Sequence, residues 1–544
     1  METLRAEGVR YVFGNPGTSE APIMSALESY PDLDYVLAVQ EGVAVGMADG
    51  YARRTGRPSF VNLHIHTGLA NGISLLTDSF LAGIPVVVTA GNADARKLAE
   101  GRWDLARMLE PVVKWSAEVT HPGQMASVMR RAFTEAKTPP TGPVFVGFAA
   151  NALDEEADQE IFPSSDAFVA TAPDPEGLAR AAELLMNAER PVLVVGDRVS
   201  QSGGTLAAVR LAERTGARVY SAGYTQVVFP TSHPQYLGML SLRSPAIRSD
   251  LQRADVVLAV GMRVFSEFFH SSEPALGPEA KLIHIDSNSG ELGRSERTEI
   301  ALLADPAAAL VALADSLDET MPGAAMEAAK SRAASLGALT AAAQASFDED
   351  MRGDTDIRPM TAARMMSELA RVWPDNAVMV DDAISSRGAL YSAIKFDRPG
   401  DLEGEVGAAI GWGMGAALGV KLGSPERPVI SVLGDGSAMM TVQALWTAAA
   451  RKIPVVYVIC NNSMYRILRV NMNVYLDQVL QQPDHERRFM GTEFEPSFDF
   501  AAIAQAFGVK SKRIEDPAEV GPALTEAVAA NEPYLLDVVI DGSL

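Results

Sequence analysis

Two polar motifs in the last third of the chain each directly follow an apolar run. Asp435 lies in the Gly-Asp-Gly-Ser sequence 434–437, after the run 429–433, and Asn462 follows the run 455–459. In a parallel sheet, ligands bind at the carboxyl ends of the strands, where neighbouring strand ends lie side by side. The carboxylate of Asp435 and the amide oxygen of Asn462 are hard oxygen ligands, which suit Mg²⁺ carrying a diphosphate.

The residues around Asp435 favour phosphate binding. Gly434 and Gly436 let backbone amides approach phosphate oxygens, and Ser437 opens the next helical stretch, whose N-terminus attracts anions. Taken alone, Gly-Asp-Gly is as well explained as a turn, and the Asn-Asn pair 461–462 as the cap of a strand. Because both motifs follow apolar strands, they jointly predict a metal–diphosphate site.

A carboxylate near the N-terminus is the second candidate for chemistry. Glu41 begins a stretch of helical character just after a strand end, and the residues that follow it, 42–48, are all small or apolar. Its side chain is therefore expected in a poorly hydrated pocket, where a carboxyl group is a good proton partner for a neutral ring nitrogen. The alternative is a solvated glutamate in a first helical turn, favoured by the helix dipole.

The combination of Gly-Asp-Gly with Asn-Asn resembles the signature of thiamine diphosphate enzymes. The whole chain resembles their decarboxylase and acetolactate synthase branch, and within it most closely the benzoylformate decarboxylases. The resemblance implies thiamine diphosphate and Mg²⁺ as cofactors, with Asp435, Asn462 and the backbone carbonyl of Met464 as metal ligands. It further implies that Glu41 holds N1′ of the aminopyrimidine ring and that Ser385 contacts the diphosphate.

The glycine-rich segment 407–415 has a related role under the same resemblance. It lacks the preceding strand and the acidic residue about 20 positions on that define a dinucleotide fingerprint. The resemblance instead implies that Ile410 is the bulky residue beneath the cofactor and that Ala408 offers its backbone carbonyl to the 4′-amino group. Tight helix packing at the glycines is an alternative that can hold at the same time.

Three residues are candidates for contact with the substrate. Thr18 stands in Asn-Pro-Gly-Thr, which resembles the Asn-Pro-Gly-Ser turn of benzoylformate decarboxylases, so its hydroxyl is expected to hold the carboxylate of a 2-oxo acid. His64 matches the histidine of their Asn-Leu-His motif, and histidine suits proton transfer near neutral pH. His66 has no counterpart, although in an extended segment it would point to the same side as His64. A lone histidine near a strand end is more often structural.

Two positions depart from the benzoylformate decarboxylase pattern. In a gap-free match, Phe268 takes the place of the second decarboxylase histidine, and His270 lies two residues on. Either His270 serves that role or the product is protonated differently. Asn471 stands where an apolar aromatic residue lines the pocket, which favours a polar or small substrate, or a second carbonyl acceptor. The long polar segment 471–496 is expected to form a lid.

The elements that must position these residues form a repeated α/β pattern, in which apolar β-branched runs alternate with stretches of helical period. We predict three consecutive doubly wound parallel-sheet domains over 1–160, 172–320 and 355–544. The resemblance makes them pyrimidine-binding, middle and diphosphate-binding domains. An acidic, proline-containing linker (151–176) and an Ala-rich, helical connection (321–359) join them. The predicted strands are 9–13, 85–89, 143–146, 191–195, 256–260, 282–285, 377–380, 429–433, 455–459 and 535–540.

Composition narrows the classes of function. The chain has 544 residues, 47% of them hydrophobic, and a formal net charge of −23, which would repel nucleic acid. The single cysteine, Cys460, excludes a disulfide framework. The charged N-terminus and the absence of an apolar run of about 18 residues predict a soluble, cytoplasmic protein.

The sequence as a whole predicts non-oxidative, thiamine diphosphate-dependent decarboxylation of a 2-oxo acid, with or without carboligation to an aldehyde. The alternatives are an acetolactate synthase-like carboligase, a 2-hydroxyacyl-CoA lyase, and a non-catalytic nucleotide-binding scaffold. Glu41, Asp435 and Asn462 together argue against the scaffold. The resemblance implies a homodimer or homotetramer in which Glu41 of one subunit serves cofactor held by Asp435 and Asn462 of its neighbour. No FAD is expected in the middle domain.

Overall fold

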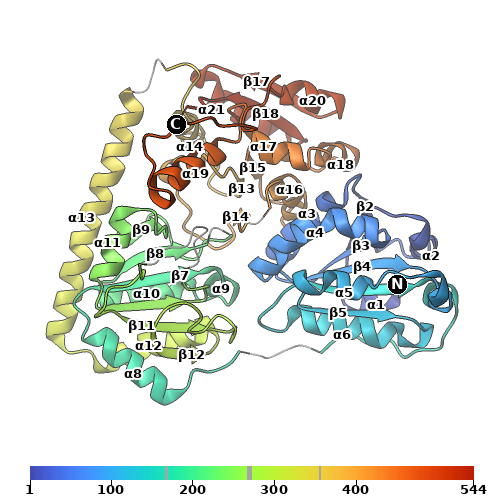
Figure 1. Cartoon of the computed structure of the whole chain (residues 1–544), viewed down its shortest axis with the longest axis horizontal. Helices are drawn as coiled ribbons and strands as arrows, with labels where there is room; N and C mark the ends of the chain where they lie inside the picture. Colours follow the sequence, from blue (N-terminus) through green and yellow to red (C-terminus); the bar gives the residue numbers. More distant parts are fainter. Residues whose placement is uncertain (166–169, 224, 266–272, 354–356, 408, 544) are drawn as a thin grey trace. The chain divides into compact units, whose positions relative to one another are not determined.

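A computed structural model describes residues 1–543 apart from 166–169, 224, 266–272, 354–356 and 408 (Figure 1). It confirms the predicted α/β class, because three consecutive domains each hold a six-stranded, all-parallel sheet. Within the described ranges, no helix combines the length and the apolar character needed to cross a membrane.

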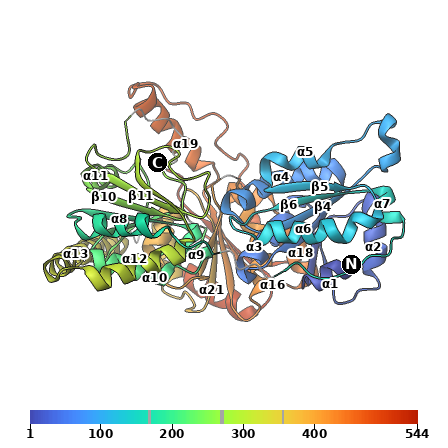
Figure 2. The ribbon, with the colours of Figure 1, turned by 90° about the horizontal axis from the view of Figure 1, so that it is seen from below.

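The first sheet has the strand order β2-β1-β3-β4-β6-β5. Strands β3, β4 and β6 are buried along their whole length, as expected for a parallel sheet with both faces covered. Figure 2 shows α4 and α5 on one side of β4, β5 and β6, with α6 on the other. The strands are β1 (Tyr11–Gly14), β2 (Asp34–Leu37), β3 (Ser59–Leu63), β4 (Val86–Asn92), β5 (Trp115–Val119) and β6 (Val144–Ala149). The helices are α1 (Glu2–Ala6), η1 (Thr18–Glu20), α2 (Ala21–Leu27), α3 (Glu41–Thr55), α4 (Ile65–Ala82), η2 (Ala95–Glu100), α5 (Leu105–Leu109), η3 (Glu110–Val112), η4 (Pro122–Gln124), α6 (Met125–Lys137) and α7 (Ala150–Asp154).

The second sheet has the order β12-β11-β10-β7-β8-β9, which is the doubly wound order of dinucleotide-binding folds. The connection predicted to be helical is the 31-residue helix α13. The strands are β7 (Pro191–Gly196), β8 (Arg218–Ala222), β9 (Tyr236–Met239), β10 (Val256–Val260), β11 (Lys281–Asp286) and β12 (Thr298–Leu303). The helices are α8 (Pro175–Met186), α9 (Asp197–Gln201), α10 (Thr205–Thr215), α11 (Pro245–Arg253), α12 (Pro306–Thr320) and α13 (Gly323–Gly353).

The third sheet has the order β14-β13-β15-β16-β18-β17. Counted from its own first strand, this is the same order as in the first sheet. The strands are β13 (Val378–Asp382), β14 (Leu402–Gly404), β15 (Val429–Gly434), β16 (Val455–Asn461), β17 (Lys510–Ile514) and β18 (Tyr534–Val539). The helices are α14 (Ala362–Ala370), α15 (Arg387–Ala393), α16 (Trp412–Gly423), α17 (Asp435–Met440), α18 (Ala444–Arg451), α19 (Arg466–Val474), the π-helix η5 (Tyr475–Val479), α20 (Phe500–Ala506) and α21 (Pro517–Ala530).

The chain forms two compact units. The first comprises residues 1–168, 356–390 and 403–544, and the second comprises 169–355 and 391–402. In the second unit, the Phe396 N–H donates to Thr231 Oγ1 at 2.7 Å, and the Thr231 N–H donates to Phe396 O at 3.0 Å. These bonds attach segment 391–402 to the domain of the second sheet.

Within the first unit, helices α3 and α16 pack backbone against backbone. A Cβ atom on Gly50 would lie 2.3 Å from the carbonyl oxygen of Ala416, and one on Gly419 would lie 1.9 Å from that of Met47. Only glycine permits such an approach, since any side chain would overlap the facing carbonyl. The contact links the helix that begins at Glu41 to the third sheet, and one apolar core runs through both domains.

Candidate functional site

The predicted metal ligands lie side by side at the carboxyl edge of the third sheet. Strands β15 and β16 are parallel neighbours with Gly434 opposite Cys460, so Asp435 and Asn462 follow adjacent strand ends. The Asp435 side chain is buried and lies near the backbone amides of residues 462–464. Burial raises the pKa of Asp435 to about 6, although these amides and that of Gly436 favour the ionised form.

The donor set at this edge fits a hard cation. Asp435 Oδ1 accepts the Gly436 N–H at 2.7 Å, whereas Oδ2 is buried without a hydrogen-bond partner of normal geometry. A buried acceptor in that state is one that a bound cation would satisfy. The part of the chain that the structure describes has no group of three His, Cys, Asp or Glu side chains able to hold a metal. The predicted Mg²⁺ ligands do not form such a group, because they combine one carboxylate, Asp435, with the Asn462 amide oxygen and the Met464 carbonyl.

The two glycines beside Asp435 have different surroundings. A Cβ on Gly436 would lie 2.3 Å from Cε1 of Tyr465, whose ring packs edge-on against Phe494 at a centroid distance of 4.7 Å. A Cβ on Gly434 would meet no atom within 4 Å. A side chain at position 436 would overlap the Tyr465 ring, so this position requires glycine. At Gly434, by contrast, the space that a side chain would occupy is open.

Asp382 connects the predicted diphosphate residues to the glycine-rich segment. Its Oδ2 accepts the N–H groups of Gly411 and Gly413, each at 3.0 Å, and its carboxyl group is also hydrogen-bonded by Ser437. The Ser437 hydroxyl thus already has a partner within the protein. Ser385, three residues after Asp382, is half-buried.

The glycines of segment 407–415 also pack tightly, as the alternative interpretation proposed. A Cβ on Gly413 would lie 2.8 Å from Asp382 Cβ, and one on Gly415 would lie 2.8 Å from Val43 O. Ile410 is half-buried just before α16. Ala408 lies outside the described residues.

Glu41 is the first residue of α3 and is held by two asparagines. Its side chain is largely buried, with 8% of the residue exposed. Asn15 Nδ2 donates to Oε1 at 3.1 Å, and Asn71 Nδ2 donates to Oε2 at 3.0 Å. Because each carboxylate oxygen accepts an amide hydrogen, Glu41 has a fixed orientation rather than the free, solvated one of the alternative.

Thr18 and His64 lie at the same edge of the first sheet, where β1 and β3 end as parallel neighbours. His64 follows β3, and a Cβ on Gly17 would lie 2.1 Å from its Nδ1, so the imidazole covers the Asn-Pro-Gly turn. Thr18, the next residue in that turn, is exposed. A Cβ on Gly68 would lie 3.2 Å from Glu41 Oε1 and 3.4 Å from His64 Cβ, so both Glu41 and His64 lie close to this glycine.

His66 has a different neighbour from His64. Its ring stacks on Trp103 at a centroid distance of 4.5 Å and an interplanar angle of 19°. Between the two histidines, Ile65 has φ +34°, a strained value for a β-branched residue. The structure therefore gives His66 an aromatic partner and brings only His64 against Gly17.

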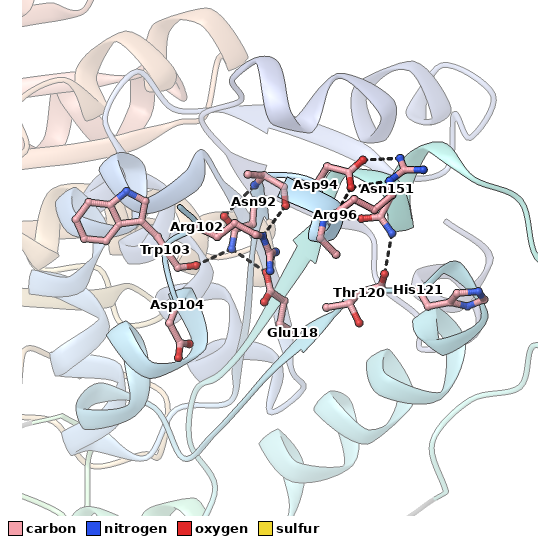
Figure 3. Close-up of polar contacts among 12 residues, drawn as sticks. Asn92, Asp94, Arg96, Arg102, Trp103, Asp104, Glu118, Thr120, His121 and Asn151 are labelled. Atoms are coloured by element: carbon pink, nitrogen blue, oxygen red, sulfur yellow. Dashed lines mark hydrogen bonds and ion pairs between the residues drawn. The ribbon is translucent and has the colours of Figure 1, made fainter. Parts of the chain in front are cut away.

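The loop that carries Trp103 is closed at its base by polar contacts, which Figure 3 shows. Asn92 Nδ2 donates to Trp103 O at 2.8 Å and to Glu118 Oε1 at 2.7 Å. Arg102 Nε donates to Ala93 O at 3.0 Å, and its guanidinium also pairs with Glu118. These contacts fix the backbone beneath Trp103, whose residue is nevertheless 61% exposed.

The remaining predicted residues lie in the middle domain and in α19. Phe268 and His270 lie outside the described residues. Asn471 is half-buried in α19, and the segment that follows continues through η5 into an irregular stretch. Arg487 ties this segment together by donating to Asn473 Oδ1 at 2.9 Å and to Asp477 Oδ1 at 2.5 Å.

Sequence reasoning missed four polar residues of the site: Asn15, Glu20, Asn71 and Asp382. Glu20 is fully buried and lies 2.7 Å from His64 Nδ1. Its position three residues after Gly17, at the start of a helical turn, matches a capping-box spacing and was a usable signal. No local sequence pattern predicts the contacts of Asn71 and Asp382, because their hydrogen-bond partners are far away in the sequence.

Comparison with known proteins follows the order of the three domains. The sequence models of thiamine pyrophosphate enzymes match residues 1–111 as the N-terminal TPP binding domain, 178–313 as the central domain and 386–538 as the C-terminal TPP binding domain. The chain belongs to the thiamine pyrophosphate (thiamine diphosphate) enzyme family, in the branch of decarboxylases and acetolactate synthases.

Similar proteins span the full length of the chain. The benzoylformate decarboxylase of Pseudomonas aeruginosa is 32% identical, with 99% of this chain and 97% of that protein covered. A probable acetolactate synthase large subunit of Methanocaldococcus jannaschii is 29% identical, with 99% and 91% covered. The solved thiamine diphosphate-dependent 4-hydroxybenzoylformate decarboxylase of Rhodococcus jostii RHA1 has a TM-score of 0.84 at 29% identity, covering 99% and 98%.

Proposed function

We propose that this enzyme decarboxylates a 2-oxo acid without oxidation, using thiamine diphosphate and Mg²⁺. The observation that carries the proposal is the grouping of Thr18, His64 and Glu41 at one edge of the first sheet, with Gly68 close to both His64 and Glu41. This grouping combines a hydroxyl for a carboxylate, an imidazole for proton transfer and an oriented carboxylate for the cofactor ring.

The residues have separate duties in this reaction. When bound, thiamine diphosphate supplies the electron sink that takes up the electrons of the breaking carbon–carbon bond. Glu41, held by Asn15 and Asn71, holds a proton at the aminopyrimidine ring. The Thr18 hydroxyl donates to the substrate carboxylate, and His64 holds or transfers a proton at the substrate carbonyl oxygen.

The cofactor would be anchored at the third sheet. Asp435, Asn462 and the Met464 carbonyl hold Mg²⁺, and the open face at Gly434 admits the diphosphate. Ser385 would contact the diphosphate, and Ile410 would lie beneath the rest of the cofactor. We further propose a homodimer or homotetramer in which Glu41 of one subunit completes the site of its neighbour, and a middle domain that holds no FAD.

The similar proteins support decarboxylation, since two of the three reported above are named as decarboxylases of benzoylformate or 4-hydroxybenzoylformate. A carboligase of the acetolactate synthase type is the second candidate. Asn471 favours it, because a half-buried amide on α19 suits a polar substrate or a second carbonyl compound better than an aromatic ring would. The cofactor residues would serve both reactions equally.

A substrate panel tests the proposal. The purified enzyme with thiamine diphosphate and Mg²⁺ is given aromatic and aliphatic 2-oxo acids, each with and without an aldehyde acceptor. We expect CO₂ release and an aldehyde product identified by mass. A hydroxyketone as the main product would support the carboligase instead, and no consumption of any 2-oxo acid would contradict both.

A further inference from the structure

Glu20 is a buried carboxylate whose two oxygens face three nitrogen atoms. Oε1 accepts the Gly91 N–H at 2.7 Å, and Oε2 accepts the Gly17 N–H at 3.0 Å. The same Oε2 lies 2.7 Å from His64 Nδ1. Glu20 is fully buried, whereas the His64 side chain is 29% exposed.

Two glycines, Gly17 and Gly91, make room for the contacts of Glu20 and His64. A Cβ on Gly91 would lie 2.6 Å from Glu20 Oε1, and one on Gly17 would lie 2.1 Å from His64 Nδ1. Glu20 therefore reaches both backbone amides and the imidazole only because two glycines line its path. Since the Nδ1 edge of the ring is packed against Gly17 and Glu20, the accessible part of the ring is the opposite edge, which carries Nε2.

The hydrogen-bond pattern decides which ring nitrogen of His64 is protonated. Both oxygens of Glu20 already accept backbone N–H groups, and an ionised carboxylate can only accept hydrogen bonds. Nδ1 must then be the donor toward Oε2. We propose that Glu20 is a positioning residue that holds His64 in the Nδ1-protonated tautomer and presents Nε2, as an acceptor, to the substrate.

The inference rests on the proposed function for its catalytic part. The Nε2–H of protonated His64, balanced by ionised Glu20, gives its proton to the substrate carbonyl oxygen as that oxygen gains negative charge. The neutral ring that remains keeps its proton at Nδ1, so Nε2 takes the proton back when the carbonyl of the aldehyde product forms. No proton passes to Glu20. A protonated Glu20 that donated to Nδ1 would reverse the tautomer and leave Nε2 unable to accept a proton.

Nitrogen NMR of the intact protein tests the tautomer directly. The full chain is labelled with ¹⁵N-histidine, sedimented and measured by magic-angle spinning at a pH where histidine rings are neutral. The His64 signals are those lost in His64→Asn. We expect a protonated Nδ1 and an unprotonated Nε2 in the wild type. We expect this state to be lost in Glu20→Gln, because the glutamine amide can present an N–H donor to Nδ1 in place of a carboxylate oxygen that accepts.

Tyr35→Phe is the matched control. Its hydroxyl is buried at the same strand edge, 2.6 Å from where a Cβ on Gly14 would lie, and makes no hydrogen bond to Glu20, His64 or any other residue that the structure describes. We expect the wild-type tautomer to persist in this variant. A wild-type ring protonated at Nε2, or a tautomer that Glu20→Gln leaves unchanged, would overturn the inference. The wild-type spectrum decides this even if Glu20→Gln does not fold.

Kinetics separate positioning from general stability. In Glu20→Gln we expect kcat for the 2-oxo acid to fall by roughly 100-fold, at the low end of what acid–base catalysis contributes, with KM little changed. A fall in Tyr35→Phe of the same size would overturn the inference. If no 2-oxo acid is consumed by the wild type, the proposed function fails, but the spectrum still decides the tautomer.

Discussion

At the scale of single residues, the site depends on polar side chains that orient one another. Glu41 has both carboxylate oxygens occupied by the amides of Asn15 and Asn71. The sequence indicated Glu41 because the stretch after it is apolar, and burial agrees with that interpretation. It could not indicate Asn71, because the contact forms only when α3 and α4 pack together.

Asn71 offers a prediction about this orientation. Asn71→Ala removes one hydrogen bond to a charged oxygen, and we expect kcat at saturating cofactor to fall about tenfold, as for the loss of roughly 1.5 kcal/mol. Asn71→Asp should be worse, because it places a second carboxylate where the amide now lies 3.0 Å from Glu41 Oε2. Steady-state kinetics with thiamine diphosphate and Mg²⁺ in excess provide the measurement.

The control for Asn71 is Ser74→Ala, an exposed position one turn further along α4. Its turnover should stay near that of the wild type. Asn71→Asp with turnover equal to or above the wild type would show that the amide does not orient Glu41.

At the scale of elements, most central strands were predicted and the edge strands were not, and the interior strands β3 and β8 were also missed. Strands such as β4, β15 and β16 are buried at nearly every position, so they appear as unbroken apolar runs. The edge strand β17 (Lys-Ser-Lys-Arg-Ile) is largely polar, and the edge strand β14 has only three residues. Such segments become strands because a neighbour supplies hydrogen bonds, which the local sequence does not reveal.

The crossing of α3 and α16 yields a prediction of stability. Gly419→Ala would place a methyl group 1.9 Å from Met47 O, so the two helices would have to separate. We expect the free energy of unfolding to fall by about 1–3 kcal/mol or more, as for overpacking of a core. Gly388→Ala in α15 is the control. Its Cβ would meet no atom within 4 Å, so we expect a gain of up to about 1 kcal/mol.

Thermal or denaturant unfolding of the two glycine variants provides the measurement. Equal stability of Gly419→Ala and Gly388→Ala would contradict the close backbone approach of α3 and α16.

At the scale of the whole molecule, buried carboxylates connect the first and third domains. Asp78 Oδ1 accepts the Ala409 N–H at 3.2 Å, and Oδ2 is buried without a partner. Nearby, Asp49 accepts hydrogen bonds from Arg53 at 2.6 Å and from the Trp412 indole at 2.8 Å. Burial above all, and then the charges of neighbouring carboxylates, raise the pKa of Asp78 to about 8.

This raised pKa predicts how stability depends on pH. Between the ordinary value of 3.8 and about 8, the folded state binds more protons at Asp78 than the unfolded state does. The stabilising contribution of protonated Asp78 is therefore fully present below about pH 4 and is lost as the pH rises through about 8. Asp78→Asn removes the titration, so its stability relative to the wild type should improve as the pH rises across this window.

Denaturant unfolding of the wild type and Asp78→Asn at several pH values provides the measurement. A difference in stability that does not change with pH, or that changes in the opposite direction, would contradict the burial of Asp78 as a proton-binding group.

The function of the molecule was predictable to the level of its enzyme family, less far than its fold. The residues proposed to hold the cofactor follow strand ends, so Asp435, Asn462 and Glu41 could be proposed from the sequence, and the N- and C-terminal TPP binding domains of the family match the segments that contain them. The residues proposed to contact the substrate lie on turns and loops. There the capping-box spacing of Glu20 did not reveal its contact with His64, and nothing in the sequence indicated the stacking of Trp103 on His66. The sequence predicts the substrate class less narrowly than the cofactor, because Asn471 departs from the aromatic residue of the benzoylformate decarboxylases.

The most direct test of the account is the comparison of Glu41→Gln with the wild type in both cofactor binding and CO₂ release. Wild-type enzyme should be stabilised against melting by thiamine diphosphate with Mg²⁺ and should release CO₂ from a 2-oxo acid. Glu41→Gln should keep much of the stabilisation, because Asp435 and Asn462 are intact, but lose CO₂ release by roughly 10²- to 10⁴-fold. Full CO₂ release by Glu41→Gln, or no stabilisation of the wild type by the cofactor, would contradict it.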